Sequence, residues 1–117
     1  MQKLNFTFLL TVLLCMVGAK ASAYDIGFSN SDGVIIYYNW INNKSELCVT
    51  YQGDNFTSYK HEYSGHVVIP QSITYNGRTY PVTTIGRDAF ADCSLLKSVT
   101  IPNTVKTIEG SAFWSCI

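Results

Sequence analysis

The sequence has few charged residues and few of the residue types that build catalytic or metal centres. Only 14% of its 117 residues are Asp, Glu, Lys or Arg, there are two histidines, and no CxxC pair occurs. The eight acidic and eight basic residues balance, which argues against a basic surface for nucleic acid. The missing cysteine pairs argue against a structural zinc site. Metal and nucleic-acid partners are therefore not expected.

Motifs for catalysis are also missing. The chain has no Gly-rich phosphate loop, no Gly-x-Ser-x-Gly and no His-Glu-x-x-His, and its carboxylates are scattered along the chain. The two histidines, His61 and His66, lie in a polar stretch that predicts surface residues near a turn. A general base needs a positioned partner within hydrogen-bond reach. We therefore predict no enzyme activity, no catalytic residues, no metal ligands and no cofactor.

The first 23 residues have the pattern of an export signal. Lys3 supplies a positive charge, residues 6–17 form an apolar run, and Ala-Ser-Ala at residues 21–23 matches an A-x-A cleavage site. A membrane anchor is the alternative, but about a dozen apolar residues are shorter than the roughly 20 that a bilayer requires. A lipoprotein signal at Cys15 lacks the small residue expected before it. Cleavage after Ala23 predicts a secreted or cell-surface protein.

Removal of this segment leaves 94 residues with six basic and eight acidic side chains, because Lys3 and Lys20 are lost. No Pro-rich, Gly-rich or charge-blocked stretch marks a linker within these 94 residues. A chain of this size can form one small domain. The slightly negative balance again argues against nucleic acid.

A repeat dominates the second half of the chain. Residues 82–93 align with residues 105–116 at an offset of 23, and six of the twelve pairs are identical. The identical residue types are mostly ones that proteins bury, so the repeated feature is an inward-facing pattern. Such a repeat predicts a solenoid, in which each coil covers the next.

Each repeat reads as one coil of mainly β structure. Val99 and Ile101 fall on one side of a short strand and Thr100 on the other. Pro102 ends this strand because it has no N–H for a ladder. We predict that a short helical turn then points Phe113 inward.

A third, partial copy lies upstream with an insertion. Residues 67–73 match residues 99–105 at an offset of 32, nine more than the repeat. Asn76-Gly77, between alternating apolar and polar residues, is a strong hairpin signal because a type I′ turn needs positive φ at both central positions. The first coil is therefore predicted to carry an inserted hairpin at residues 73–82.

The repeat resembles that of the BspA-like leucine-rich-repeat proteins, a bacterial cell-surface class. The resemblance covers residues 67–117 and rests on the Leu96-x-x-Val99-x-Ile101-Pro pattern and on the Ile-Gly-x-x-Ala-Phe-x-x-Cys core of residues 85–93. The second copy departs from this core, since Glu109 replaces the glycine and Gly110 follows it. The resemblance implies a leucine-rich-repeat solenoid and adhesion to host extracellular proteins.

The leader, residues 24–66, resembles the family only loosely. Residues 34–41 are rich in β-branched and aromatic side chains, Asn42 to Ser45 favour a turn, and residues 46–51 alternate again. This pattern predicts a β-hairpin. We interpret the leader as a β-rich N-terminal cap over the open side of the first coil, with a ligand-binding role as the alternative.

Three cysteines remain after cleavage: Cys48, Cys93 and Cys116. Cys93 and Cys116 occupy the same repeat position, and stacked repeats hold equivalent side chains parallel at about 4.7 to 4.9 Å. A disulfide needs its Cβ atoms closer, at about 3.5 to 4.5 Å, and turned toward each other. We therefore favour a ladder of free thiols over a disulfide, and the redox state of the three thiols stays open.

Two functions from different classes remain. The first is a secreted or surface-exposed interaction protein that binds protein partners, such as host extracellular matrix or surface proteins, through four residues of its repeat strands: Val68, Lys97, Ser98 and Thr100. The second is a carbohydrate-binding module that stacks leader aromatics on sugar rings. Its candidate residues are Tyr37, Tyr38, Trp40 and Tyr51, with Tyr59 and Tyr63. Coplanar, solvent-facing rings would favour sugar, and buried rings would remove that hypothesis.

The chain stops in the middle of a repeat, one residue after Cys116. Two coils and a fragment are fewer than the three or more that such arrays need. We therefore expect either a longer repeat array or self-association through this edge.

Overall fold

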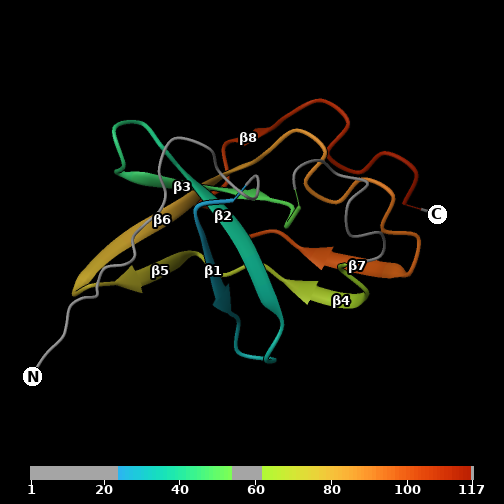
Figure 1. The fold of residues 1–117 in the computed structure, drawn as a ribbon, viewed down its shortest axis with the longest axis horizontal. Helices are drawn as coiled ribbons and strands as arrows, with labels where there is room; N and C mark the ends of the chain where they lie inside the picture. The colour runs from blue at the N-terminus through green and yellow to red at the C-terminus, as the bar shows by residue number, and fades with distance from the viewer. Residues whose placement is uncertain (1–23, 54–61, 117) are drawn as a thin grey trace, which may run out of the picture.

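The computed structural model describes residues 24–53 and 62–116. The predicted signal segment, Tyr59 and His61 lie outside these residues. Within the described ranges all regular structure is β and no helix is formed. Eight strands give a mostly-strand fold in which a leader of three strands precedes two repeat coils (Figure 1).

The leader forms an antiparallel meander. Strands β1 (Ile26–Ser29) and β2 (Ile35–Ile41) pair with each other, and β2 pairs with β3 (Glu46–Thr50). The predicted hairpin is therefore present. Its turn places Asn42, Asn43 and Lys44 in the left-handed region, which short polar residues such as Asn tolerate best. The pairing of β1 with β2 was not predicted.

The inserted hairpin also forms where Asn-Gly indicates it. Strand β5 (Ser72–Tyr75) pairs antiparallel with the first half of β6 (Arg78–Ile85). Asn76 and Gly77 have φ values of 51° and 78°, as the type I′ turn requires. The second half of β6 extends beyond the hairpin and pairs with other strands.

Parallel strand pairs join the two coils, which we define as residues 65–93 and 96–116. Strand β4 (Gly65–Val68) pairs with β7 (Leu96–Thr100), with Val67 opposite Val99. Strand β6 pairs with β8 (Thr107–Ile108), with Ile85 opposite Ile108. Both registers equal the offsets of 32 and 23 found in the sequence. Figure 1 shows β4 and β7 side by side.

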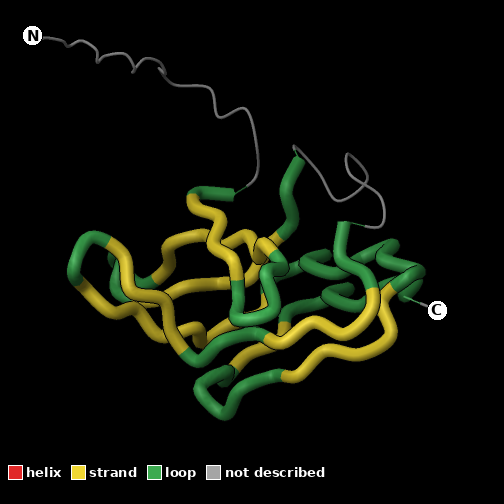
Figure 2. The backbone as a smooth tube through the Cα atoms, turned by 90° about the horizontal axis from the view of Figure 1, so that it is seen from below, coloured by secondary structure: helices red, strands yellow, loops and turns green. Residues whose placement is uncertain are grey.

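The predicted helical turns are wrong, because the coils close through successive tight turns instead. Asp88 and Asp92 have φ near +60°, as do their counterparts Ser111 and Ser115. A helix cannot continue through left-handed residues. The two turn segments run side by side (Figure 2), and the Phe90 N–H donates to the Ala112 carbonyl at 2.8 Å.

The core is continuous from the leader to the second coil. The Phe90 side chain is fully buried. Its ring stacks parallel on Phe113 with centroids 5.2 Å apart and contacts the buried Tyr63 ring at 4.7 Å. The expectation that Phe90 and Phe113 lie one above the other is confirmed.

Strand β3 occupies the place that a preceding coil would take against β6. The Gly86 N–H donates to the Val49 carbonyl at 2.8 Å. In the same way, the Glu109 N–H donates to the Ile85 carbonyl at 2.9 Å. Gly86 and Glu109 are equivalent repeat positions. Val49 of the leader therefore makes the same backbone contact with the first coil that Ile85 makes with the second coil. This pairing closes the β6 edge, which otherwise would expose unpaired backbone groups.

The cysteines of the described residues are free thiols. Cys93 is buried, and burial raises the pKa of its thiol to about 11. The half-buried Cys116 thiol donates to the Phe90 carbonyl at 2.7 Å. The structure thus favours the thiol ladder, and such buried thiols are poor nucleophiles because the thiolate is disfavoured.

Two buried tyrosines provide a matched test of the polar contacts in this core. The Tyr63 hydroxyl donates to the Thr50 carbonyl at 2.9 Å and accepts from the Tyr37 N–H at 3.1 Å. The Tyr38 hydroxyl, also fully buried, has no hydrogen-bond partner among the described residues. We expect Tyr63→Phe to lower the free energy of unfolding by about 2 kcal/mol. Tyr38→Phe should leave it unchanged or raise it by up to about 1 kcal/mol.

Urea denaturation of the two variants and the wild type measures both effects. Because both changes remove one hydroxyl from a buried ring, they differ mainly in the hydrogen bonds lost. Equal destabilisation by the two substitutions would contradict the hydrogen-bond assignment.

Candidate functional site

The candidate site is the solvent-facing side of β4 and β7, which we call the outer face. Three of the four residues proposed from the sequence (Val68, Ser98 and Thr100) lie there together, each exposed. They belong to two paired positions, since Val68 lies opposite Thr100 and His66 lies opposite Ser98. Parallel pairing across the coils therefore brings residues 32 positions apart into one surface.

Lys97, the fourth residue, lies at an irregularity in the pairing. The register shifts after the Gly65 and Leu96 pair, so that His66 pairs with Ser98 and Lys97 has no partner position on β4. A residue bulged out of a ladder in this way re-aims its side chain. Lys97 is exposed, and it is the cationic side chain of these two strands.

His66 is the residue of this face that sequence reasoning did not select. Its Nδ1 atom lies 2.6 Å from the Ser98 hydroxyl oxygen, within hydrogen-bond distance. The 32-residue offset that aligns Val67 with Val99 also places His66 opposite Ser98, so the signal was present in the sequence. The structure gives the outer face an imidazole beside a hydroxyl.

The turn between β1 and β2 braces one end of the outer face. The Asn30 side-chain amide donates to the Val68 carbonyl at 2.9 Å. Its Oδ1 atom accepts from the Asp32 and Val34 N–H groups, both at 2.9 Å. One side chain therefore fixes the turn and attaches the leader to β4.

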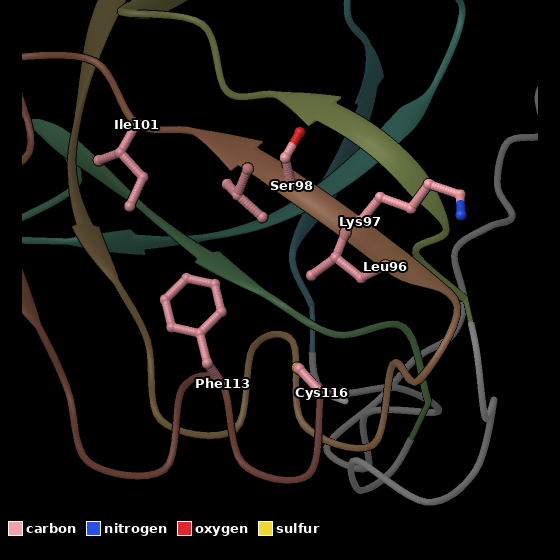
Figure 3. A pocket seen from close by; sticks show the side chains of 7 residues that line it. Leu96, Lys97, Ser98, Ile101, Phe113 and Cys116 are labelled. Atoms are coloured by element: carbon pink, nitrogen blue, oxygen red, sulfur yellow. The ribbon is translucent and has the colours of Figure 1, made fainter.

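An open groove of about 260 Å³ adjoins β7, and the residues that line it do not include any from β4. Its apolar walls are formed by Leu96, Val99, Ile101, Phe113 and Cys116. In Figure 3, Phe113 rises from the last turn toward β7, and Lys97 and Ser98 border the same space. Ser98 of the outer face and the neighbouring Lys97 thus also line the groove.

The aromatic residues proposed for sugar stacking do not form a flat exposed platform. Tyr38 and Tyr63 are fully buried, so these two assignments are wrong: the rings pack in the core and offer no face to a ligand. Tyr37 is half-buried against Tyr24 and tilted 59° to it. Trp40 meets Tyr80 edge-on at 4.6 Å, and Tyr51 is half-buried. The rings pair with one another across strands, which is the usual role of aromatics in a sheet.

Among the described residues no group of three or more His, Cys, Asp or Glu side chains is arranged to hold a metal ion. The same part of the chain forms no helix long and apolar enough to cross a membrane.

Glu62, at the start of the segment that leads into β4, has a carboxyl group with a raised pKa. Burial raises the pKa of its carboxyl to about 7, against the opposing effect of a hydrogen bond from the Gln52 N–H at 2.8 Å. A carboxyl whose pKa is raised on folding stabilises the fold only while it stays protonated. This contribution is full below about pH 4.5 and is lost as the pH rises through about 7.

We therefore expect the wild type to lose about 1 to 2 kcal/mol more stability between pH 5 and pH 8 than Glu62→Gln does, a value reduced for partial solvent screening. Urea denaturation of both proteins at several pH values gives this difference directly. Other titrating groups are common to the two proteins and cancel. Parallel stability curves would show that Glu62 ionises in the fold as it does in solvent.

Comparisons with known proteins find a leucine-rich-repeat family model and leucine-rich-repeat structures that are similar to this chain. A family model described as a BspA type leucine rich repeat region (6 copies) matches residues 71–117. A leucine-rich repeat protein from Bacteroides ovatus is 31% identical over 69% of this chain, with a TM-score of 0.56. A leucine rich cell surface protein from Faecalibacterium prausnitzii is 26% identical over 79% of this chain, with a TM-score of 0.54.

This chain spans about a fifth of the length of each of these two proteins (20% and 21%). No curated protein matches the sequence.

Proposed function

Residues 71–117 are a BspA-type leucine-rich repeat region, and from this premise we propose that the chain belongs to a secreted or surface-exposed protein that binds other proteins. The partners that we propose are host extracellular matrix or surface proteins. The role is binding rather than catalysis. The proposed surface location is supported by the similarity to a protein from Faecalibacterium prausnitzii described as a leucine rich cell surface protein.

One observation carries the assignment of the binding surface. The two parallel strands β4 and β7 lie side by side with Val68, Ser98 and Thr100 exposed, so one apolar and two hydroxyl side chains form a continuous patch. Repeat proteins present their variable exposed positions to partners while the repeated positions fill the core. The repeated positions here are Ile85, Phe90 and their counterparts, and the first two are fully buried.

The test compares the mature chain from Tyr24 with a face variant and a control variant. Thr100→Glu adds a charge to the outer face beside Val68, and Ser72→Glu adds the same charge at an exposed hydroxyl of β5. Binding is measured on a panel of purified extracellular matrix proteins by biolayer interferometry. We expect at least one member to bind the wild type and Ser72→Glu alike.

Thr100→Glu should weaken this binding about tenfold, which corresponds to about 1.4 kcal/mol. No binding to any panel member, or equal binding by the two variants, would overturn the proposed surface. Circular dichroism of both variants shows whether they keep the wild-type fold.

A further inference from the structure

The hydrogen bond between His66 and Ser98 can run in two directions. A neutral imidazole with its hydrogen on Nε2 accepts at Nδ1, so the Ser98 hydroxyl must be the donor across the 2.6 Å contact. A protonated imidazole carries hydrogens on both nitrogens, so Nδ1 becomes the donor and Ser98 the acceptor. The contact survives protonation, but its polarity reverses.

This reversal changes what the outer face offers to a partner. In the first state the Ser98 hydrogen is occupied by His66 and its oxygen is free to accept. In the second state the Ser98 oxygen is occupied and its hydrogen can turn toward a partner. Protonation of His66 therefore gives the face one hydroxyl donor and one positive charge.

The surrounding charges determine which partner gains from this change. On β4 and β7, Lys97 is the other charged side chain, and it directly precedes Ser98 in the sequence. The nearby β1–β2 turn, held to Val68 by Asn30, carries the exposed Asp32. Lys97, protonated His66 and the Ser98 hydroxyl are hydrogen-bond donors at neighbouring positions of β4 and β7, and such donors suit carboxylate oxygens.

We infer that the outer face recognises acidic segments of protein partners, and that protonation of His66 strengthens this recognition by reversing its hydrogen bond with Ser98. The inference rests on the proposed function, since it names the partner class for the same surface. Binding to an acidic segment is then expected to be stronger at pH 5.5 than at pH 7.5.

The first experiment follows the hydrogen bond itself, without a partner. Nitrogen-15 NMR of the mature chain, labelled at histidine and titrated from pH 8 to pH 5, reports which ring nitrogen carries a hydrogen. His61→Gln assigns the His66 signals. We expect neutral His66 to carry its hydrogen on Nε2 and to gain a second one on Nδ1. A neutral ring protonated at Nδ1 would overturn the inference, because Nδ1 would then donate in both states.

The second experiment measures recognition with poly-L-aspartate, a probe whose carboxyl groups stay largely ionised at pH 5.5. We expect the wild type to bind it about three- to fivefold more tightly at pH 5.5 than at pH 7.5, the gain of one exposed ion pair. His61→Gln is the matched control and should keep this ratio, whereas His66→Gln should bring the ratio close to one. An unchanged ratio in His66→Gln, or no binding at either pH, overturns the inference.

The experiments distinguish failure of the acidic-segment inference from failure of the proposed binding function. The matrix-protein panel tests whether Thr100 lies in a binding surface at neutral pH, whatever the charge of the partner. Panel binding lost in Thr100→Glu together with a flat pH response would retain the binding surface and reject acidic selection.

Discussion

Phe90→Ala is expected to lower the free energy of unfolding by about 3 to 5 kcal/mol, the range for removing a large aromatic side chain from a core. The ring is fully buried and lies between two others, Phe113 at 5.2 Å and Tyr63 at 4.7 Å. Tyr63 belongs to the leader and Phe113 to the second coil. Phe90 therefore joins the two ends of the described fold, and its loss leaves a cavity that both must collapse to fill.

Urea or thermal denaturation of the chain from Tyr24 onward measures this loss. Phe113→Ala is the matched control, because it removes the other ring of the same stack from a half-buried position. Its cost should be about 1 to 2 kcal/mol, since partial exposure lets water replace the ring. Similar losses in the two variants would mean that Phe90 is not the central residue of a shared core.

Sequence offsets predicted the register of the coils. The spacing of 32 between Val67 and Val99 and of 23 between Ile85 and Ile108 returned as paired positions in parallel strands. This worked because equivalent residues of stacked coils meet the same neighbours, so the identity pattern records the contact. The Asn76-Gly77 turn was predicted for a local reason, its requirement for positive φ.

Features decided by tertiary surroundings were not predicted. The expected helical turn at Ala112-Phe113 failed because Ser111 and Ser115 adopt positive φ, a choice stabilised by backbone contacts to the neighbouring coil. Alternation along β2 did not reveal that Tyr38 lies fully in the core, because either face of a strand can be the buried one until its partners are known.

The candidate site also combines features that the sequence predicted with features that it did not. Val68, Ser98 and Thr100 could be proposed from the period-two pattern of their strands, and they are exposed. His66 lies opposite Ser98 by the same offset of 32, whereas the shift in register that leaves Lys97 without a partner position could not be predicted from the sequence. Such irregularities arise from the fit between two strands and leave no mark on the period of either one.

Gly86 should tolerate an added methyl group poorly. A Cβ atom there would lie 2.8 Å from Cys48 Sγ and 2.9 Å from the Val49 carbonyl oxygen, both closer than van der Waals contact allows. The Val49 carbonyl cannot withdraw without breaking its 2.8 Å hydrogen bond from the Gly86 N–H. Gly86→Ala is therefore expected to separate β3 from β6 and to lower the free energy of unfolding by about 2 to 3 kcal/mol.

Gly110 offers the control for this substitution, because it lies in the equivalent turn of the second coil, shifted by one position. A Cβ atom there would approach only the Arg87 side chain, at 3.7 Å, an ordinary contact. Gly110→Ala should therefore change stability by less than about 0.5 kcal/mol.

Cys48→Ala separates the two contacts at Gly86. It removes the Sγ atom but leaves the Val49 carbonyl in place, so the double variant with Gly86→Ala should recover only part of the loss. Denaturation curves of the four proteins form a double-mutant cycle that measures this coupling. Full tolerance of Gly86→Ala would show that β3 does not approach the first coil closely. Glu109 occupies the equivalent position one coil later, and its side chain reaches back to the first coil, where Oε1 accepts from the Arg87 N–H at 3.0 Å.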